Sequence, residues 1–139
     1  MKPDFNKEKF NKEDFIKKLK KASTIETTCP GYEDNWDKKD NPAWGQCTMY
    51  ALAYDSKLDE LGITNKSLAK CYAITKDNKK YLHLINIVEG KIEDLSKSQF
   101  KGDVKYENIE EVSKKEVLSW KDKEKERFQI FQKNLSDLS

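Results

Sequence analysis

A cysteine at the start of a predicted helix is the residue of this sequence best suited to covalent chemistry. Cys47 follows Trp-Gly-Gln, and apolar residues recur after it at helical spacing as far as Leu61, where Gly62 favours the end of a helix. The first turn of a helix offers unpaired backbone N–H groups and the positive end of the helix dipole, and both favour a thiolate. Because the thiolate is the attacking form, we predict that Cys47 is a nucleophile. The simpler alternative is a small core residue.

The single histidine of the chain is the candidate base for Cys47. His83 lies in the middle of the stretch YLHLINIV, whose composition predicts a β-strand. Glu89-Gly90 then predicts a two-residue hairpin turn into a second strand that carries Asp94. A lone histidine in a strand is more often structural than functional, so its neighbours on the same sheet face decide its interpretation.

The register of this predicted hairpin selects the partner of the histidine. A two-residue turn places Val88 opposite Lys91, and His83 then lies diagonally across from Asp94 on the same face. Asn86 is three residues from the histidine on the same strand, so it points to the opposite face and is excluded as the partner. The sequence therefore predicts a nucleophile, a base and an orienting carboxylate, which is the general arrangement for covalent acyl transfer.

The remaining cysteines give no second site. Cys29 and Cys71 are interpreted as reduced, small core residues, and Cys71 has no activating neighbour in its predicted strand. The spacing of three cysteines and one histidine fits no zinc pattern, and the chain has no glycine-rich phosphate loop. We expect neither a metal nor another cofactor.

Composition limits the partners of the protein. The 139 residues predict one domain, with residues 1–10 as a loose leader. Charged residues make up 37% of the chain, but 27 basic and 25 acidic residues leave a net charge of only +2, with a single arginine. Nucleic-acid binding needs gathered basic residues, and a membrane span needs about 18 consecutive apolar residues. Without a secretory signal, we expect a cytoplasmic monomer or weak homo-oligomer that binds neither nucleic acid nor membrane.

The first third of the chain predicts a helix and then a long loop. Residues 11–22 have an apolar stripe among lysines, which predicts an amphipathic surface helix. Residues 23–46 are rich in turn-forming residues, yet they contain Trp36 and Trp44, which favour an ordered loop. We predict that both tryptophans form a wall beside the thiol. The alternative is that they anchor the loop to the core.

The rest of the chain predicts an antiparallel sheet followed by helices. Residues 69–75 and 81–88 are predicted strands joined by a hairpin, and residues 92–95 form a third strand. Residues 100–112 are expected to be an irregular return. A short helix is predicted near Lys114–Trp120 and a longer one from about Asp122. This order of elements is typical of an α+β domain in which a nucleophile helix packs on a small antiparallel sheet.

The ordered set of residues resembles a known superfamily. A Gly-Gln-Cys that opens a helix, a strand with His-x-x-Asn and a following Asp-Leu-Ser are similar to the transglutaminase-like and papain-like cysteine proteins. More narrowly, NPAWGQC, HLINIVEGKIEDLSKSQF and ERFQIFQKNL resemble the YunG-like family of small uncharacterised bacterial proteins. The resemblance implies a papain-like fold with Cys47, His83 and Asp94 as a catalytic triad. It also implies that Gln46 or Asn41 assists at the oxyanion.

Two function classes stay open. The first is a cysteine-dependent hydrolase or acyltransferase, such as an amidase, peptidase or deamidase, acting on a peptide or protein amide. The second is a catalytically inactive relative that binds a protein or peptide in the same groove. We favour the enzyme, because a decayed site has no need of its only histidine and a face-matched aspartate. In a third interpretation, Cys47 and His83 merely pack in an α+β core.

Overall fold

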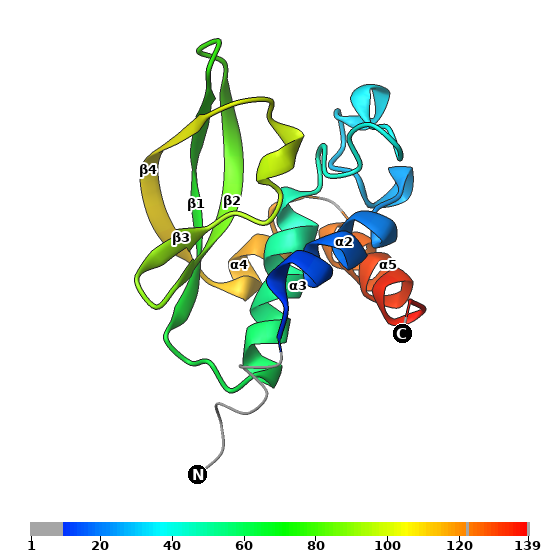
Figure 1. Cartoon of the computed structure of the whole chain (residues 1–139), viewed down its shortest axis with the longest axis vertical. Coiled ribbons are helices and arrows are strands. Elements are labelled where there is room, and N and C mark those ends of the chain that lie inside the picture. Colours follow the sequence, from blue (N-terminus) through cyan, green and yellow to red (C-terminus); the bar gives the residue numbers. More distant parts are fainter. Residues whose placement is uncertain (1–9, 122, 139) are drawn as a thin grey trace.

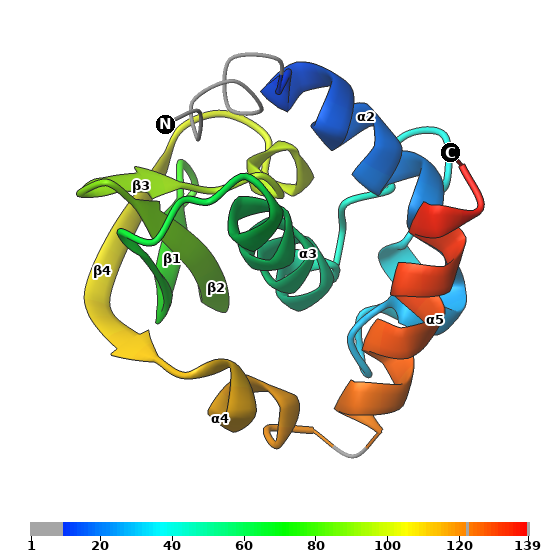
Figure 2. The ribbon, with the colours of Figure 1, turned by 90° about the horizontal axis from the view of Figure 1, so that it is seen from below.

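The chain folds around one central helix that packs between a sheet and two further helices. The computed structural model describes residues 10–121 and 123–138. The helices are α2 (Lys12–Ala22), α3 (Cys47–Glu60), α4 (Lys114–Leu118) and α5 (Glu124–Ser136), and the strands are β1 (Lys66–Thr75), β2 (Lys80–Val88), β3 (Lys91–Glu93) and β4 (Val104–Val112). Figure 1 shows α3 beside the sheet, and the turned view in Figure 2 shows α2 and α5 on its far side. The α+β class is confirmed.

Helix α3 is the centre of the core. The predicted stripe from Tyr50 to Leu61 is buried, and Met49, Leu52 and Ala53 on its other sides are buried too. A helix that is covered by the sheet on one side and by α5 on the other needs apolar residues all round. The helix starts at Cys47, as predicted, and Gly62 follows its end with a φ of +78°. Packing of α3 in the core therefore fixes the position of Cys47 at the start of the helix.

The sheet has the strand order β3-β2-β1-β4, and every pairing is antiparallel. Residues 104–112 form the regular edge strand β4 beside β1, so the expected irregular return over residues 100–112 was wrong there. The sequence did not indicate this strand, because most of its side chains are exposed and four of the nine are charged. A register shift opposite Cys71, with Asn108 at a φ of +56°, interrupts the alternation further.

The hairpin that carries the histidine has the predicted register. Glu89 and Gly90 both adopt positive φ, as the favoured two-residue hairpin turn requires, and Val88 pairs with Lys91. β3 is short and pairs only with residues 86–88 of β2 within the described chain. The chain leaves β3 through Asp94, directly beside the middle of β2.

The two ends of the described chain close the core. Phe10, which was expected in the loose leader, is half-buried and contacts the rings of Phe15 and Tyr54. The rest of that leader, residues 1–9, lies outside the described residues. In α5, the predicted apolar face is buried at Phe128 and Phe131. No helix in the described part is long and apolar enough to cross a membrane.

Candidate active site

The structure brings the predicted base and carboxylate together. His83 Nε2 lies 2.7 Å from Asp94 Oδ2, and the two side chains are only 1% and 3% exposed. The imidazole thus uses Nε2 for the carboxylate and keeps Nδ1 for another partner. Asn86 lies on the opposite face, as predicted, where its side-chain amide donates to the backbone oxygen of Ala51. The register of the β2–β3 hairpin therefore makes Asp94, and not Asn86, the partner of His83.

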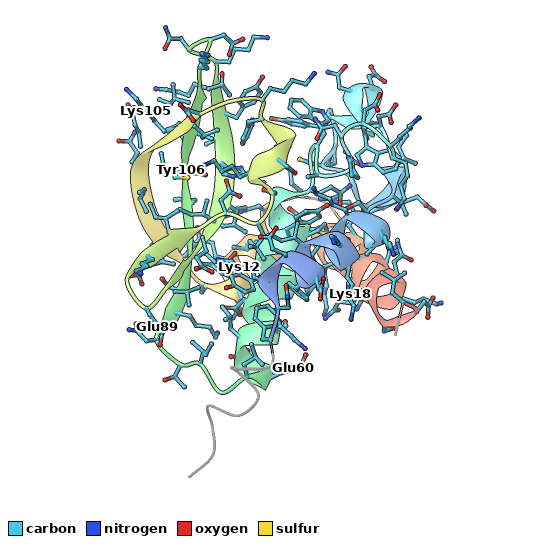
Figure 3. The ribbon with its side chains drawn as sticks, viewed as in Figure 1. Lys12, Lys18, Glu60, Glu89, Lys105 and Tyr106 are labelled. Atoms are coloured by element: carbon cyan, nitrogen blue, oxygen red, sulfur yellow. The ribbon has the colours of Figure 1, made fainter. Side chains whose placement is uncertain are left out.

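Three further groups hold the carboxylate of Asp94. The backbone N–H and the hydroxyl of Ser96 both donate to Oδ1, at 3.1 and 3.0 Å. The hydroxyl of Tyr106, labelled on β4 in Figure 3, donates to Oδ2 at 2.8 Å. Burial alone would raise the pKa of Asp94, but the hydrogen bond and charge of His83, with the Tyr106 and Ser96 donors, outweigh it and lower that pKa.

Two aromatic rings enclose the imidazole of His83. Phe100 meets it edge-on with the ring centroids 5.2 Å apart, and Tyr106 stacks against it at 6.2 Å with the planes 13° apart. Burial disfavours the imidazolium, but the charge of Cys47 and the hydrogen bond that the ring donates to Asp94 outweigh it, so the pKa of His83 is raised. The residue is therefore fixed in position and favoured in its protonated form.

The thiol of Cys47 has the electrostatics of a nucleophile. Burial would raise its pKa, and the charge of Asp94 acts in the same direction. The charge and hydrogen bond of His83, helped by a hydrogen bond from the Leu84 backbone, outweigh both and lower the pKa of Cys47. The pair therefore favours a thiolate beside an imidazolium, although the cysteine itself stays partly exposed.

The other two thiols have the opposite character. Burial and the charges of Asp94 and Cys47 raise the pKa of Cys71 to about 12. Burial and the charge of Cys47 raise the pKa of Cys29, which lines the same cavity as the candidate nucleophile. All three cysteines are free thiols. The direction of the pKa shift thus distinguishes Cys47 from both of them.

The thiol opens into a cavity of about 390 Å³. This volume lies within the range of ligand pockets. The cavity lies between the long loop, strand β2 and the connection from α4 to α5. Besides Cys47 and His83, its walls include six aromatic or aliphatic residues, Tyr32, Tyr81, Leu82, Leu84, Phe100 and Trp120. Lys70, Lys121 and Glu124 add charge around it.

The predicted oxyanion helpers are engaged elsewhere. Gln46 is fully buried, and its side-chain amide bonds to Thr24, Thr27 and Thr28 of the long loop. Asn41 donates its side-chain N–H to the backbone oxygen of Gln99 and lines a neighbouring cavity. Both side chains hold the loop in place, so neither is directed at the thiol. The residue spacing alone could not reveal these competing partners.

The two tryptophans of the predicted wall also lie outside the cavity of the thiol. Trp36 donates its indole N–H to the backbone oxygen of Pro42, which ties the loop to itself. Trp44 packs against the rings of Tyr32 and Tyr81, at 5.4 and 5.9 Å between centroids. These two tyrosines line the cavity, so Trp44 packs against residues of the cavity wall without lining the cavity itself. The long loop is ordered, and its contribution to the wall comes from Cys29, Tyr32 and Gly45.

Gln99 is a residue of the site that the sequence interpretation missed. Its side-chain N–H donates to Ser96 Oγ at 3.0 Å, and its side-chain oxygen accepts from the backbone N–H of Gly45 at 3.2 Å. The chain of bonds thus runs from the carboxylate of Asp94 to the segment just before Cys47. Ser96, Gln99 and Phe100 were visible as part of the motif DLSKSQF, but their roles depend on contacts between distant segments.

Within the described ranges, no group of three or more histidine, cysteine, aspartate and glutamate side chains could hold a metal ion.

Comparison with known proteins places the chain in a family. Neither the comparison with curated proteins nor that with solved structures finds a match. The model of the YunG protein family matches residues 11–138, which include every residue of the site described above. The match covers nearly the whole sequence and agrees with the resemblance in NPAWGQC and HLINIVEGKIEDLSKSQF. The chain belongs to the YunG protein family.

Proposed function

We propose that this protein is a cysteine-dependent acyl-transfer hydrolase that acts on an amide of a peptide or protein. The observation that carries the proposal is the 2.7 Å bond from buried His83 to Asp94, beside a cysteine whose pKa the same histidine lowers. A packing role would not need a buried carboxylate with four donors. The order of cysteine on a helix, histidine on a strand and aspartate after it supports a papain-like or transglutaminase-like placement.

The proposed reaction uses only side chains and water. The Cys47 thiolate attacks the carbonyl carbon, which forms a C–S bond and leaves the charge on the carbonyl oxygen. When this intermediate collapses, the C–N bond breaks and the imidazolium of His83 gives its proton to the leaving amine. A water molecule then loses a proton to the neutral imidazole and attacks the thioester, which releases the acid and restores the thiolate. Asp94 orients the ring throughout.

The backbone at the start of α3 supplies the nearest oxyanion donor. The first N–H groups of a helix have no partner within the helix, and Gln46 at the N-cap makes no side-chain capping bond. The N–H of Cys47 is therefore the donor that we assign to the developing negative charge. The engaged side chains of Gln46 and Asn41 are not part of this assignment.

Activity-based labelling tests the proposal. We expect peptide probes with electrophilic warheads, such as vinyl sulfones and acyloxymethyl ketones, to label the wild-type protein at Cys47. Cys47→Ala should abolish the label, and Cys29→Ala should leave it unchanged, because the pKa of Cys29 is raised. If no electrophile labels the wild type although peptides bind in the cavity, the protein is a binding module and the proposed function is wrong.

A further inference from the structure

The outer edge of β2 is open beside the thiol. β3 covers only residues 86–88 of this edge, and β1 lies on the other side of the strand. From Tyr81 to Ile85, no strand pairs with the outer edge within the described residues. Four consecutive residues of this part, from Tyr81 to Leu84, line the cavity of Cys47. The edge is therefore reachable from the candidate catalytic centre.

The backbone groups of Leu82 point out of this edge. In antiparallel pairs, residues that bond to each other alternate with residues whose N–H and C=O point outward. The hairpin begins with a bond from Thr75 N–H to the oxygen of Lys79, so the alternation turns Leu82 and Leu84 outward. The hydrogen bond between the Leu84 backbone and the Cys47 thiol agrees with this outward direction of the Leu84 backbone groups. The backbone N–H and C=O of Leu82 lie two residues further along the same edge.

The side chain of Leu82 is the most exposed large apolar side chain of the described chain, at 72%. It points to the same face as Leu84, which is buried against the core around α3. Helix α3 begins at Cys47, and the side chain of Leu82, two residues before Leu84 on β2, stays uncovered. An exposed leucine at an open strand edge is a feature that monomeric proteins usually avoid, since such edges attract other chains.

The open edge leads toward a second cavity with basic side chains. This cavity, of about 610 Å³, shares Tyr81, Gln99 and Phe100 with the first and lies at the tip of the β1–β2 hairpin. Lys76, Lys79 and Lys101 line it against a single acidic residue, Asp77. A strand advances about 3.4 Å per residue, so about five residues reach from the level of Leu84 to the tip. The charge of this end favours carboxylates.

We propose that the substrate is an extended polypeptide segment that pairs its main chain with the edge of β2 at Leu82 and directs acidic side chains to the lysines of the hairpin tip. Its scissile amide then lies beside Cys47, and its backbone supplies the partners that no other described residue gives to the backbone of Leu82. The chemistry of this step rests on the proposed function, whereas the binding does not. A small amide would reach the thiol without using either feature.

Binding to the Cys47→Ala protein tests the main-chain contact. The probes are pools of fluorescent random decapeptides, each with a fixed Glu-Glu or Lys-Lys pair at one terminus. We expect one Glu-Glu pool to bind, and N-methylation of alternate backbone amides to weaken its binding about tenfold, the effect of one lost hydrogen bond. Methylation of the intervening amides should change it less than about twofold. Equal effects at all positions would overturn the proposal.

A pair of variants tests the same contact from the protein. Leu82→Pro removes the outward N–H, and an edge strand tolerates proline where that group is not bonded to a neighbouring strand. We expect about tenfold weaker binding for this variant, and at most about threefold for Leu82→Ala, which keeps the N–H. If Leu82→Pro does not fold, the N-methyl series and the chemical shift of the Leu82 amide on peptide addition decide. An unchanged shift at saturation would overturn the pairing.

The charge preference has its own control. We expect the Glu-Glu pool to bind about tenfold better than the Lys-Lys pool at low salt, with the ratio falling at high salt because the lysines are exposed. Changing Lys79 and Lys101 to Gln should remove most of this ratio. Changing the exposed Lys17 and Lys18 on α2 should not, since α2 lies away from the hairpin tip (Figure 3). Equal binding of both pools would refute the acidic preference.

The two proposals can fail separately. If acidic peptides bind along Leu82 but no electrophile labels Cys47, the reaction is wrong and the docking edge stands. If Cys47 is labelled but binding ignores N-methylation and charge, the docking edge is wrong and the reaction stands.

Discussion

The two halves of the candidate site are held by different means. The histidine half is fixed by side chains, because Asp94 accepts bonds from His83, Ser96 and Tyr106 and the rings of Phe100 and Tyr106 enclose the imidazole. The cysteine half is fixed by backbone packing. Gly45, two residues before the thiol, accepts a bond from Cys29 N–H at 2.9 Å and approaches the loop closely.

This difference fits the roles that we propose for the two halves. A base needs one orientation and a controlled charge, which buried hydrogen bonds supply. A nucleophile must remain reachable, so its position is better set by the helix and loop behind it than by contacts to the sulfur. The comparison predicts that changes behind the cysteine reduce stability, whereas changes around the histidine reduce thiol reactivity.

The largest expected effect is on the backbone behind the cysteine. A Cβ at Gly45 would lie 2.7 Å from Thr28 Cγ2 and 2.9 Å from Tyr32 Cβ, and the residue has a φ of +71°. Overpacking and the left-handed backbone together should cost Gly45→Ala about 3 kcal/mol of unfolding free energy. Gly62→Ala has a similar φ of +78° but open space, so it should cost only about 1 kcal/mol. Chemical denaturation measures both, and equal losses would show that the close packing at Gly45 is unimportant.

Removal of His83, the proposed base, should have the largest effect on thiol reactivity. In His83→Gln the burial of Cys47 is no longer opposed, so the pKa of the thiol should rise above the usual value of about 8.5. In the wild type the lowered pKa keeps the thiolate at neutral pH, and alkylation slows only as the pH falls through that lowered value. We expect iodoacetamide to label Cys47 about 100-fold more slowly in His83→Gln at pH 6.5. Mass spectrometry of the labelled peptide over a pH series checks the rate and midpoint; an unchanged midpoint would contradict the pairing.

Loss of the carboxylate charge should have an intermediate effect. Asp94→Asn keeps the shape but removes the ionised acceptor from His83, and we expect about tenfold slower labelling at neutral pH. The folded pKa of Asp94 is lowered, so its ionised form stabilises the fold above about pH 3.9 and this contribution is lost as the pH falls through the lowered value. The stability difference between wild type and Asp94→Asn should therefore shrink in acid.

Asn86→Ala is the control for the carboxylate. Its amide donates to Ala51 on the other sheet face, so the variant should lose about 1–3 kcal/mol of stability with unchanged labelling of the folded protein. Slower labelling in this control than in the aspartate variant would reverse the assigned roles.

The smallest expected effect concerns a positioning residue. Tyr106→Phe keeps the ring on His83 but loses the hydroxyl bond to Asp94, so we expect labelling about two- to fivefold slower and a higher pH midpoint. Tyr72→Phe on the opposite face, where the ring lies under Lys80, should leave both unchanged. A lower rate with an unmoved midpoint would indicate a structural role for the hydroxyl alone.

The parts of the site that were predictable depend on local periodicity. The helix start at Cys47 follows from its apolar pattern, and the side-by-side placement of His83 and Asp94 follows from one tight turn and the two-residue alternation of strands. Strand β4 was not predictable, because as an exposed edge it carries charges where a buried strand carries apolar residues. The position of Tyr106 of this strand in the candidate site was therefore not predicted from the sequence.

The misplaced side chains share a different cause. The sequence places Gln46 and Trp44 close to Cys47, but the directions of their side chains depend on the fold of the long loop, which brings Thr24, Thr27 and Tyr32 into contact with them. Proximity along the chain says little about direction in an irregular segment. Gln99 shows the converse, since a residue far from Cys47 in sequence contacts the backbone beside it.

The side-chain amide of Gln99 connects the histidine half of the candidate site to the cysteine half. It bonds to Ser96 on one side and to the N–H of Gly45 on the other, and its own backbone oxygen accepts from Asn41. These buried hydrogen bonds make local unfolding of the site cooperative, because the long loop cannot separate from the sheet side without leaving polar groups there without hydrogen bonds. The amide protons of Gly45 and Ser96, distant in sequence, should therefore exchange with solvent at matching rates, and the candidate site should melt as one unit.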